Sequence, residues 1–180
     1  MSSEAIPSQP GAHPKVHAAE MKGGTDMGGS REDAVRDEVG HWFFDDYLPT
    51  WVAVGSGAIP RGPEFILDYW AAPLHISGPA SRDSLLDGDA VIGWLERHQA
   101  ALRAQGYSYT AVPDSRMVFY HDAGVAIEVI WSRRRVDDSE IERLAVHFEV
   151  ARESAGWRVV GIQHASTTAD SLSTVWQAAS

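Results

Sequence analysis

The sequence contains no cysteine among its 180 residues. This absence excludes thiol catalysis, disulfide frameworks and metal sites with cysteine ligands. Long apolar runs are missing too, because no stretch approaches the roughly 20 residues that a membrane-spanning helix needs. The N-terminal residues also lack the apolar centre of a secretion signal. We therefore expect a cytoplasmic protein without a membrane partner.

Basic residues are few: 15 Lys and Arg stand against 25 Asp and Glu, which gives a formal net charge of −10. A surface this acidic repels phosphate backbones, so no nucleic-acid partner is expected. The basic run Arg133-Arg134-Arg135 fits the solvated end of a hairpin. The sequence shows no metal-ligand spacing, phosphate-binding glycine loop or nucleophile elbow. It therefore predicts no metal and no cofactor, and the only catalysis that its residues support is acid–base chemistry.

The apolar content is sufficient for one folded domain. Hydrophobic residues make up 44% of the chain, and seven residues are tryptophans, which is enough for a core without a disulfide or a metal. Residues 1–29 are rich in proline and glycine and poor in large apolar residues, so we expect a disordered N-terminal tail there. We expect the folded domain over residues 30–168 and a C-terminal tail over 169–180.

Helical patterns fill much of the first part of this domain. Apolar residues recur every three or four positions in three segments. Capping residues, glycine and proline mark their limits, and a proline is expected to kink or end the first helix. The predicted limits are Ser30 and Pro49, Pro63 and Tyr69, and Asp87 or Asp89 and Gly106.

Strand patterns occupy a short segment before the third helix and most of the chain after it. The predicted strands are Leu74–Ser77, Tyr107–Tyr120, Val125–Val136, Ile141–Arg152 and Trp157–Ser166. The separators between the last four are short and polar or contain glycine, as in hairpins. Helices followed by consecutive hairpins predict an α+β domain.

Alternation along the last three strands assigns each residue to one face of the sheet. The predicted inner face, covered by helices, holds Val125, Ile127, Val129, Trp131, Leu144, Val146, Phe148, Val150, Trp157 and Val159. The predicted outer face holds polar residues that include Glu128, Ser132, Arg134, His147, Glu149, Arg158 and His164. Because strand side chains alternate with a period of two, a slip of one residue would reverse every assignment.

Several loose motifs join these elements into a recognisable order. They are Asp45-Asp46-Tyr47-Leu48, Tyr69-Trp70, Pro73-Leu74-His75-Ile76, Ala126 to Trp131, and Gly156-Trp157-Arg158-Val159-Val160 with His164-Ala165-Ser166. Over about residues 30–166 the chain resembles the NTF2-like superfamily, and within it the SnoaL-like group. The resemblance implies a cone-shaped fold, with about three N-terminal helices on a curved, mostly antiparallel sheet and an apolar cavity between them. It also implies a homodimer formed through the sheet.

Candidate site residues come from positions expected to face that cavity. Asp46 follows Trp42 and Phe43 by four and three residues, so aromatic rings would desolvate its carboxylate, raise its pKa and suit it to proton transfer. Asp46 could equally lie at the edge of the apolar stripe and meet water. The expected catalytic residues are Asp46, His75, Tyr47 and Tyr69. The expected substrate-binding residues are Trp42, Trp131, Arg133, Phe148 and Gln163. His98, on the apolar stripe of the third helix, is expected to be a hydrogen-bonded core histidine.

Two functions remain open, because members of the superfamily include isomerases, cyclases, dehydratases and non-catalytic binding domains. The first is a small-molecule pocket protein that acts as a cofactor-independent isomerase, cyclase or dehydratase on an apolar carbonyl compound. The second is a non-catalytic ligand-binding or dimerisation module. The enzyme requires two titratable groups within reach of one point in the cavity, and the binding module does not. In both cases the expected ligand is small and apolar or aromatic.

Overall fold

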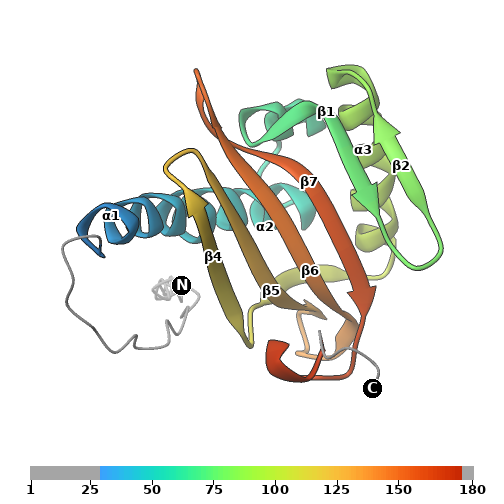
Figure 1. The fold of residues 1–180 in the computed structure, drawn as a ribbon. Coiled ribbons are helices and arrows are strands. Elements are labelled where there is room, and N and C mark those ends of the chain that lie inside the picture. The colour runs from blue at the N-terminus through green and yellow to red at the C-terminus, as the bar shows by residue number, and fades with distance from the viewer. Residues whose placement is uncertain (1–28, 176–180) are drawn as a thin grey trace, which may run out of the picture.

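The computed structural model describes residues 29–175, which form helices and a curved seven-stranded sheet (Figure 1). This confirms the predicted α+β class with a mostly antiparallel sheet. Residues 1–28 and 176–180, which include most of the expected N-terminal tail and part of the expected C-terminal tail, lie outside the described residues. The domain boundaries therefore stay a prediction. No helix within residues 29–175 combines the length and the apolar character needed to cross a membrane.

A long helix forms the N-terminal layer and passes Pro49 without ending there. It consists of α1 (Gly29–Gly40), the π-helical segment η1 (His41–Tyr47) and α2 (Leu48–Gly55), which follow one another directly. In an α-helix, the ring of a proline clashes with the carbonyl four residues earlier. The π-helical segment has a wider turn, in which the Leu48 N–H donates to the carbonyl of Phe43, and this makes room for the proline ring.

The other helices differ in how closely they follow the predictions. The second predicted helix is a short 3-10 segment, η2 (Pro63–Asp68). The third is α3 (Gly88–Ala104), whose start is capped as expected: the Asp87 side chain accepts a hydrogen bond from the Ala90 N–H at 2.9 Å. Gly106, with a φ of +80°, follows its end in the conformation that favours glycine.

The seven strands lie in the order β2-β1-β7-β6-β5-β3, and β4 pairs with β5 as well. The strands are β1 (Trp70–Ser77), β2 (Arg82–Leu85), β3 (Tyr107–Ala111), β4 (Ser115–His121), β5 (Gly124–Arg135), β6 (Glu140–Glu153) and β7 (Gly156–Ser166). Every pair is antiparallel except β1 with β7. The sequence did not predict β2, which completes a hairpin with β1.

The predicted strand Tyr107–Tyr120 is divided into β3 and β4 by a break that contains Pro113. Proline has no N–H to donate to a neighbouring strand. The side chain of the next residue, Asp114, accepts a hydrogen bond from the Leu172 N–H at 2.8 Å. This contact ties the sheet edge to the C-terminal 3-10 segment η3 (Leu172–Thr174).

The predicted inner face of the sheet is confirmed, because all ten of its apolar residues belong to the core cluster that the helices cover. The pairing differs in detail. Pairing the strands across their turns predicts Trp131 opposite Val146, Val150 opposite Val159 and Phe148 opposite Gly161. In the structure Trp131 pairs with Leu144, two residues away from Val146. A shift of two residues preserves the face of every side chain. The predicted faces are therefore correct, although the predicted pairing of β5 with β6 differs by two residues.

A β-bulge in β7 reverses the expected faces near the end of that strand. Val159 pairs with Val150 as expected, but Phe148 pairs with Ile162 instead of Gly161. A bulge places one extra residue in a strand and so changes the direction of the side chains beyond it.

Two assignments are corrected by the bulge. His164, predicted on the outer face, lines the cavity on the inner side, whereas Gln163, predicted on the inner face, is exposed. His147 and Glu149 lie on β6, which has no extra residue here, and they stay on the predicted outer face. There, His147 Nδ1 is 3.2 Å from Glu128 Oε1.

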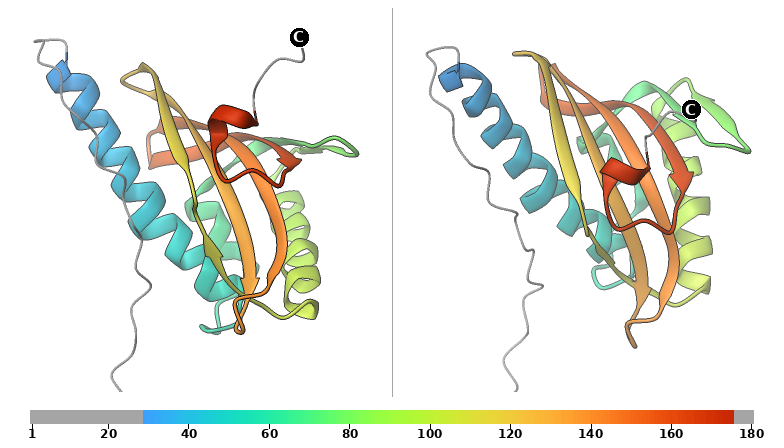
Figure 2. Two further views of the ribbon diagram at one scale, coloured as in Figure 1. Left: turned by 90° about the horizontal axis from the view of Figure 1, so that it is seen from below. Right: turned by 60° about the horizontal axis from the view of Figure 1, so that its bottom comes forward.

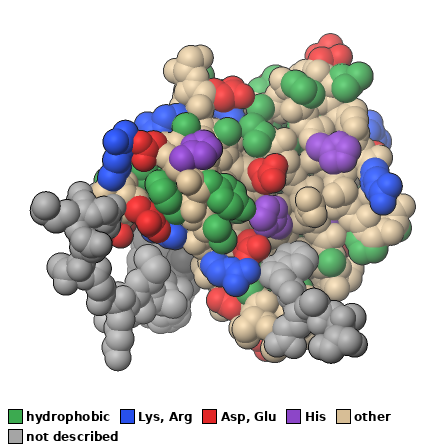
Figure 3. Space-filling model, in the orientation of Figure 1, with side chains coloured by type: hydrophobic (Ala, Val, Ile, Leu, Met, Phe, Trp, Pro, Cys, Tyr) green, Lys and Arg blue, Asp and Glu red, His purple; other side chains and the backbone are tan. Residues whose placement is uncertain are grey.

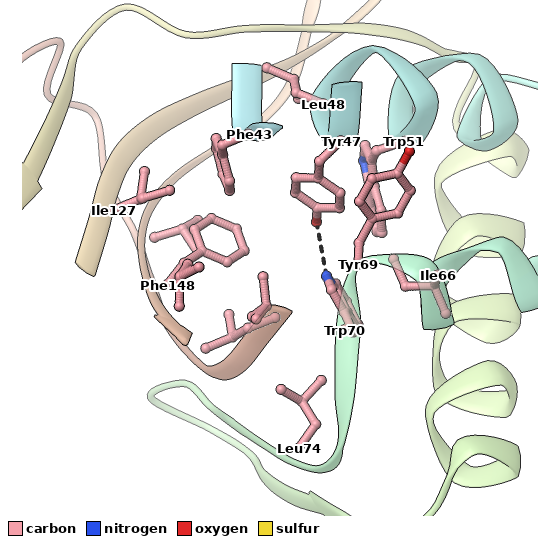
Figure 4. Packing of buried hydrophobic residues seen from close by; sticks show 14 of the residues in the cluster. Phe43, Tyr47, Leu48, Trp51, Ile66, Tyr69, Trp70, Leu74, Ile127 and Phe148 are labelled. Atoms are coloured by element: carbon pink, nitrogen blue, oxygen red, sulfur yellow. Dashed lines mark hydrogen bonds between the residues drawn. The ribbon is translucent and has the colours of Figure 1, made fainter. Parts of the chain in front are cut away.

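The core lies between the long helix and the sheet (Figure 4). Phe43 and Tyr47 point from η1 toward the sheet, and the centroid of the Phe43 ring is 5.1 Å from that of Phe148 on β6. Figure 2 shows η3 on the opposite side of the sheet from α2, where Leu172 is buried. Both faces of β5 are therefore covered over part of its length.

We expect Phe43→Ala to lower the free energy of unfolding by about 3–5 kcal/mol, because it removes a fully buried ring from the helix–sheet contact. Phe44→Ala is the matched control, since Phe44 is only partly buried, and it should cost clearly less. Denaturant unfolding of both variants measures the difference. Equal losses would contradict the helix phase in which Phe43, and not Phe44, faces the sheet.

Candidate functional site

A cavity of about 230 Å³ lies between the helices and the inner face of the sheet. Four of its lining residues are tryptophans, which come from four different elements: Trp51 from α2, Trp70 from β1, Trp94 from α3 and Trp131 from β5. Apolar residues of β1, β6 and β7, Phe148 among them, complete the apolar part of the wall. The cavity is therefore predominantly aromatic.

The tryptophan rings are held in place by one another. Trp51 and Trp70 stack with their centroids 5.9 Å apart, and Trp70 also lies 5.9 Å from Trp94. Trp131 lies 6.2 Å from Trp51. The Trp70 Nε1–H donates to the hydroxyl of Tyr47 at 3.2 Å, the contact drawn in Figure 4. Large flat surfaces fixed in this way suit the stacking of another ring.

Polar groups lie in one part of the wall, around Arg133. This arginine is only 3% exposed, and its Nη1 donates to Nε2 of His98 at 2.9 Å and to the carboxylate of Glu142. Its guanidinium carbon also lies 5.5 Å from the centre of the Trp131 ring, within the range of a cation–π contact. A buried positive charge therefore borders an aromatic cavity.

Burial and the contact with Arg133 together keep His98 neutral. Arginine has no acceptor, so the Nε2 that receives its hydrogen bond must be the unprotonated nitrogen of a neutral imidazole. Burial, with the charge of Arg133 as the second cause, lowers the pKa of His98 to about 3. His98 also stacks on Trp94 at 4.8 Å. It is the hydrogen-bonded core histidine that the sequence predicted, and it lines the cavity as well.

His164 and Asp83 are the other titratable groups in the wall. Burial and the charge of Arg133 lower the pKa of His164, which is half-buried. Asp83 accepts a hydrogen bond from the Trp94 Nε1–H at 3.2 Å. The cavity therefore contains a cation, a carboxylate and two imidazoles whose neutral forms are favoured.

Three buried donors in the wall are unpaired. Trp51 Nε1, Trp131 Nε1 and Arg133 Nε find no hydrogen-bond partner among residues 29–175. A buried donor without an acceptor costs about 1–3 kcal/mol, so such groups require an explanation.

The four expected catalytic residues do not meet at this cavity. Asp46 is exposed, so the expected desolvation of its carboxylate is absent. It accepts a hydrogen bond from the Tyr69 hydroxyl at 2.8 Å, outside the cavity lining. His75 is exposed and lies 3.1 Å from the Ser84 hydroxyl. Tyr47 is buried against Trp70, and burial raises the pKa of its hydroxyl.

Three of the five expected substrate-binding residues line the cavity: Trp131, Arg133 and Phe148. Trp42 does not, because its ring stacks on Tyr47 at 6.1 Å on the helix side. Gln163 lies in a separate hollow at the surface, as a consequence of the bulge.

Trp51, Trp70 and Trp94 also line the cavity and were not predicted from the sequence. One usable signal was present for Trp51, since Phe43, Tyr47 and Trp51 follow one another at intervals of four residues across Pro49. This continuity was not predicted, because Pro49 was expected to kink or end the first helix. For metals, no three His, Asp or Glu side chains in the described part of the chain gather closely enough to hold an ion.

Comparison with known proteins places this geometry in context. A family model described as NTF2-like protein (DUF6841) matches residues 37–167. No curated protein matches the chain.

Solved structures that resemble the chain share its fold at low sequence identity. An NTF2-like protein with a cystatin-like fold from Novosphingobium aromaticivorans is 16% identical, with a TM-score of 0.57, over 81% of this chain and 93% of that one. A candidate scytalone dehydratase from the same organism is 13% identical, with a TM-score of 0.51, over 77% and 88%. A candidate calcium/calmodulin-dependent protein kinase II association domain from Xanthomonas campestris is 10% identical, with a TM-score of 0.52, over 73% and 86%. These similarities concern the fold alone.

We expect the free energy of unfolding to fall as the pH drops below about 6.5, the ordinary pKa of histidine. Above that pH, His98 is neutral in the folded and the unfolded chain. Below it, the unfolded chain takes up a proton that the folded chain excludes until about pH 3. The contribution of His98 approaches about 1.4 kcal/mol per pH unit, and His164 acts with the same sign.

Denaturant unfolding between pH 7 and pH 5 measures this dependence. The slope should be smaller in His98→Gln, because the variant has no imidazole to protonate in the unfolded state. An identical slope in the two proteins would show that His98 takes up a proton in the folded state.

Proposed function

This chain belongs to the NTF2-like family DUF6841, and we propose that it binds a small aromatic or apolar molecule with an oxygen acceptor in the tryptophan-lined cavity. The observation that carries the proposal is the cavity itself. Protein interiors are normally filled to the density of organic crystals. Here four tryptophans from separate elements surround space that no side chain of residues 29–175 occupies.

The size of the cavity limits the ligand. Pockets for drug-sized molecules typically measure about 300–1,000 Å³, whereas this cavity measures about 230 Å³. A compound with one or two rings fits this space better than a polycyclic one. Stacking against the flat walls supplies the attraction for such rings.

The unpaired donors support an oxygen acceptor on the ligand. Trp131 Nε1 and Arg133 Nε lack partners within residues 29–175, and both residues line the cavity. A carbonyl or phenol oxygen would then offset the cost of a buried unpaired donor. Arg133 would add a charge-assisted hydrogen bond.

Acid–base catalysis in the same cavity is the second candidate, favoured by the two imidazoles in its wall. His98 and His164 lie close enough for the charge of one to affect the pKa of the other. A neutral imidazole can accept a proton, but a pKa of about 3 makes His98 a weak base at neutral pH. Binding therefore ranks first, and His164 is the better candidate for proton transfer. The positions of Asp46, His75, Tyr47 and Tyr69 do not support catalysis in this cavity, because none of them lines it.

A homodimer through the outer face of the sheet stays a prediction. Figure 3 views this side of the molecule and shows histidine, acidic and hydrophobic side chains on it. The large apolar side chains exposed in the described residues are Ile59, Leu86, Tyr120 and Val136, and none of them lies on β5, β6 or β7. The outer face of β5, β6 and β7 therefore resembles a weak protein–protein interface more than a permanent one.

We expect Trp94→Ala to weaken the binding of a one- or two-ring aromatic ligand at least tenfold, because it removes one wall of the cavity. Trp42→Ala is the matched control: it also deletes a partly buried tryptophan, but one outside the cavity lining. A panel of aromatic carbonyl compounds, screened by ligand-observed NMR and followed by calorimetry, supplies the ligand. Equal weakening in both variants, or no ligand in the panel, would count against the proposed function.

Light scattering of the full chain at micromolar concentration tests the dimer. A homodimer should give twice the chain mass of 19.7 kDa, and Glu149→Arg, which reverses an exposed charge on the outer face, should shift the mass toward the monomer. A single chain mass in the unmodified protein would contradict pairing through the sheet.

A further inference from the structure

The cavity shares one side chain with a second hollow at the surface. The hollow measures about 220 Å³ and is lined by Ser77, Gly78, Pro79, Arg82, Gln163 and His164. It lies at the turn between β1 and β2, beside the C-terminal end of β7 (Figure 1), where Ser77 pairs with Gln163. His164 belongs to the wall of both spaces. Its side chain, called the partition below, therefore lies where the two spaces meet.

The position of this partition depends on Gly78. A Cβ on Gly78 would lie 2.6 Å from Cε1 of His164, too close for any side chain. The ring is half-buried, and it forms no hydrogen bond with any residue of the described chain. A swing of the ring away from Gly78 would therefore break no hydrogen bond within the described chain.

Arg82 gives the hollow a positive charge. Its side chain is exposed, and no acidic group within residues 29–175 forms an ion pair with it. Gln163 and Ser77 add groups that can donate hydrogen bonds to an oxygen. Because the chain carries a formal net charge of −10, most of its surface repels anions. A local preference for an acid must therefore come from a cation at the site.

We propose that the cavity and the hollow are two halves of one binding site for an aromatic acid, with the rings among the tryptophans and the acidic group beside Arg82. The inference rests on the proposed function, since it requires that the cavity accept an aromatic group. Joined, the two spaces fall within the range of about 300–1,000 Å³ that is typical of small-molecule pockets, which neither reaches alone. His164 swings aside when the acid binds.

Calorimetry with matched acids and amides tests the inference. The probes are naphthalene-2-carboxylate, naphthalene-2-acetate and naphthalene-2-propionate, which place the acid at increasing distance from the rings, and the three corresponding amides. We expect at least one acid to bind the full chain about tenfold more tightly than its amide, as a charge-assisted hydrogen bond provides. Arg82→Gln should abolish that preference and leave amide binding unchanged.

Arg97→Gln is the control, because Arg97 is also an exposed arginine but lines neither space. It should retain the preference for the acid. Equal affinities of acid and amide in the unmodified protein would overturn the inference and leave the proposed function standing. A preference that survives Arg82→Gln would overturn it too, because the acid would then lie elsewhere. Failure of every acid and amide to bind would instead overturn the proposed function itself.

A crystal structure of the complex with the tightest acid gives an independent test. The carboxylate should lie within hydrogen-bond distance of the Arg82 guanidinium, and the His164 ring should have left its position against Gly78. A carboxylate bound to Arg133, with the His164 ring still against Gly78, would overturn the inference.

Discussion

The contact between one row of aromatic side chains on the long helix and two rings on the sheet positions everything else in this molecule. Phe43, Tyr47 and Trp51 lie at intervals of four residues, and they meet Phe148 and Trp131 on the inner face of the sheet. At the Phe43 end this contact is closed, since Phe43 is fully buried. At the Trp51 end, the tryptophans of β1 and α3 hold the layers apart, and the cavity forms there. The core and the site are thus two ends of one packing arrangement.

Arg133 shows that this cavity is not simply imperfect packing. A buried cation is costly unless its charge and its hydrogen bonds are compensated. Glu142 compensates the charge, His98 accepts a hydrogen bond, and two tryptophan rings lie within 6.0 Å of the guanidinium carbon. One N–H nevertheless stays unpaired within residues 29–175. A leucine at this position would avoid the whole cost, so the arginine is better explained by recognition of a ligand than by stability.

The sequence predicted the inner face of the sheet well because alternation is a local property that a two-residue change of register does not alter. It could not predict the bulge at Gly161, since an extra residue depends on which pairs form across two strands. That single residue exchanged the roles of Gln163 and His164. The same limit applies to Asp46. In an α-helix it would share a face with Phe43, but the wider π-helical turn rotates it into solvent. The π-helical segment precedes Pro49, and the sequence pattern alone favoured an end there.

The site residues were harder to predict than the fold because no local motif contains them. The four tryptophans of the wall come from a helix, two strands that pair with different neighbours, and a second helix. Each of them, taken alone, is a large apolar residue with an ordinary role in a core. Their common function arises only from rigid mutual packing, with Trp94 parallel to His98 and Trp51 nearly parallel to Trp70. Walls that are both flat and fixed discriminate by shape, because a bulky aliphatic group would have to separate stacked rings, whereas a planar ring would not. In the proposed site, the aromatic walls would therefore determine which shape can enter, and the charges of Arg133 and Arg82 would determine how the ligand is oriented.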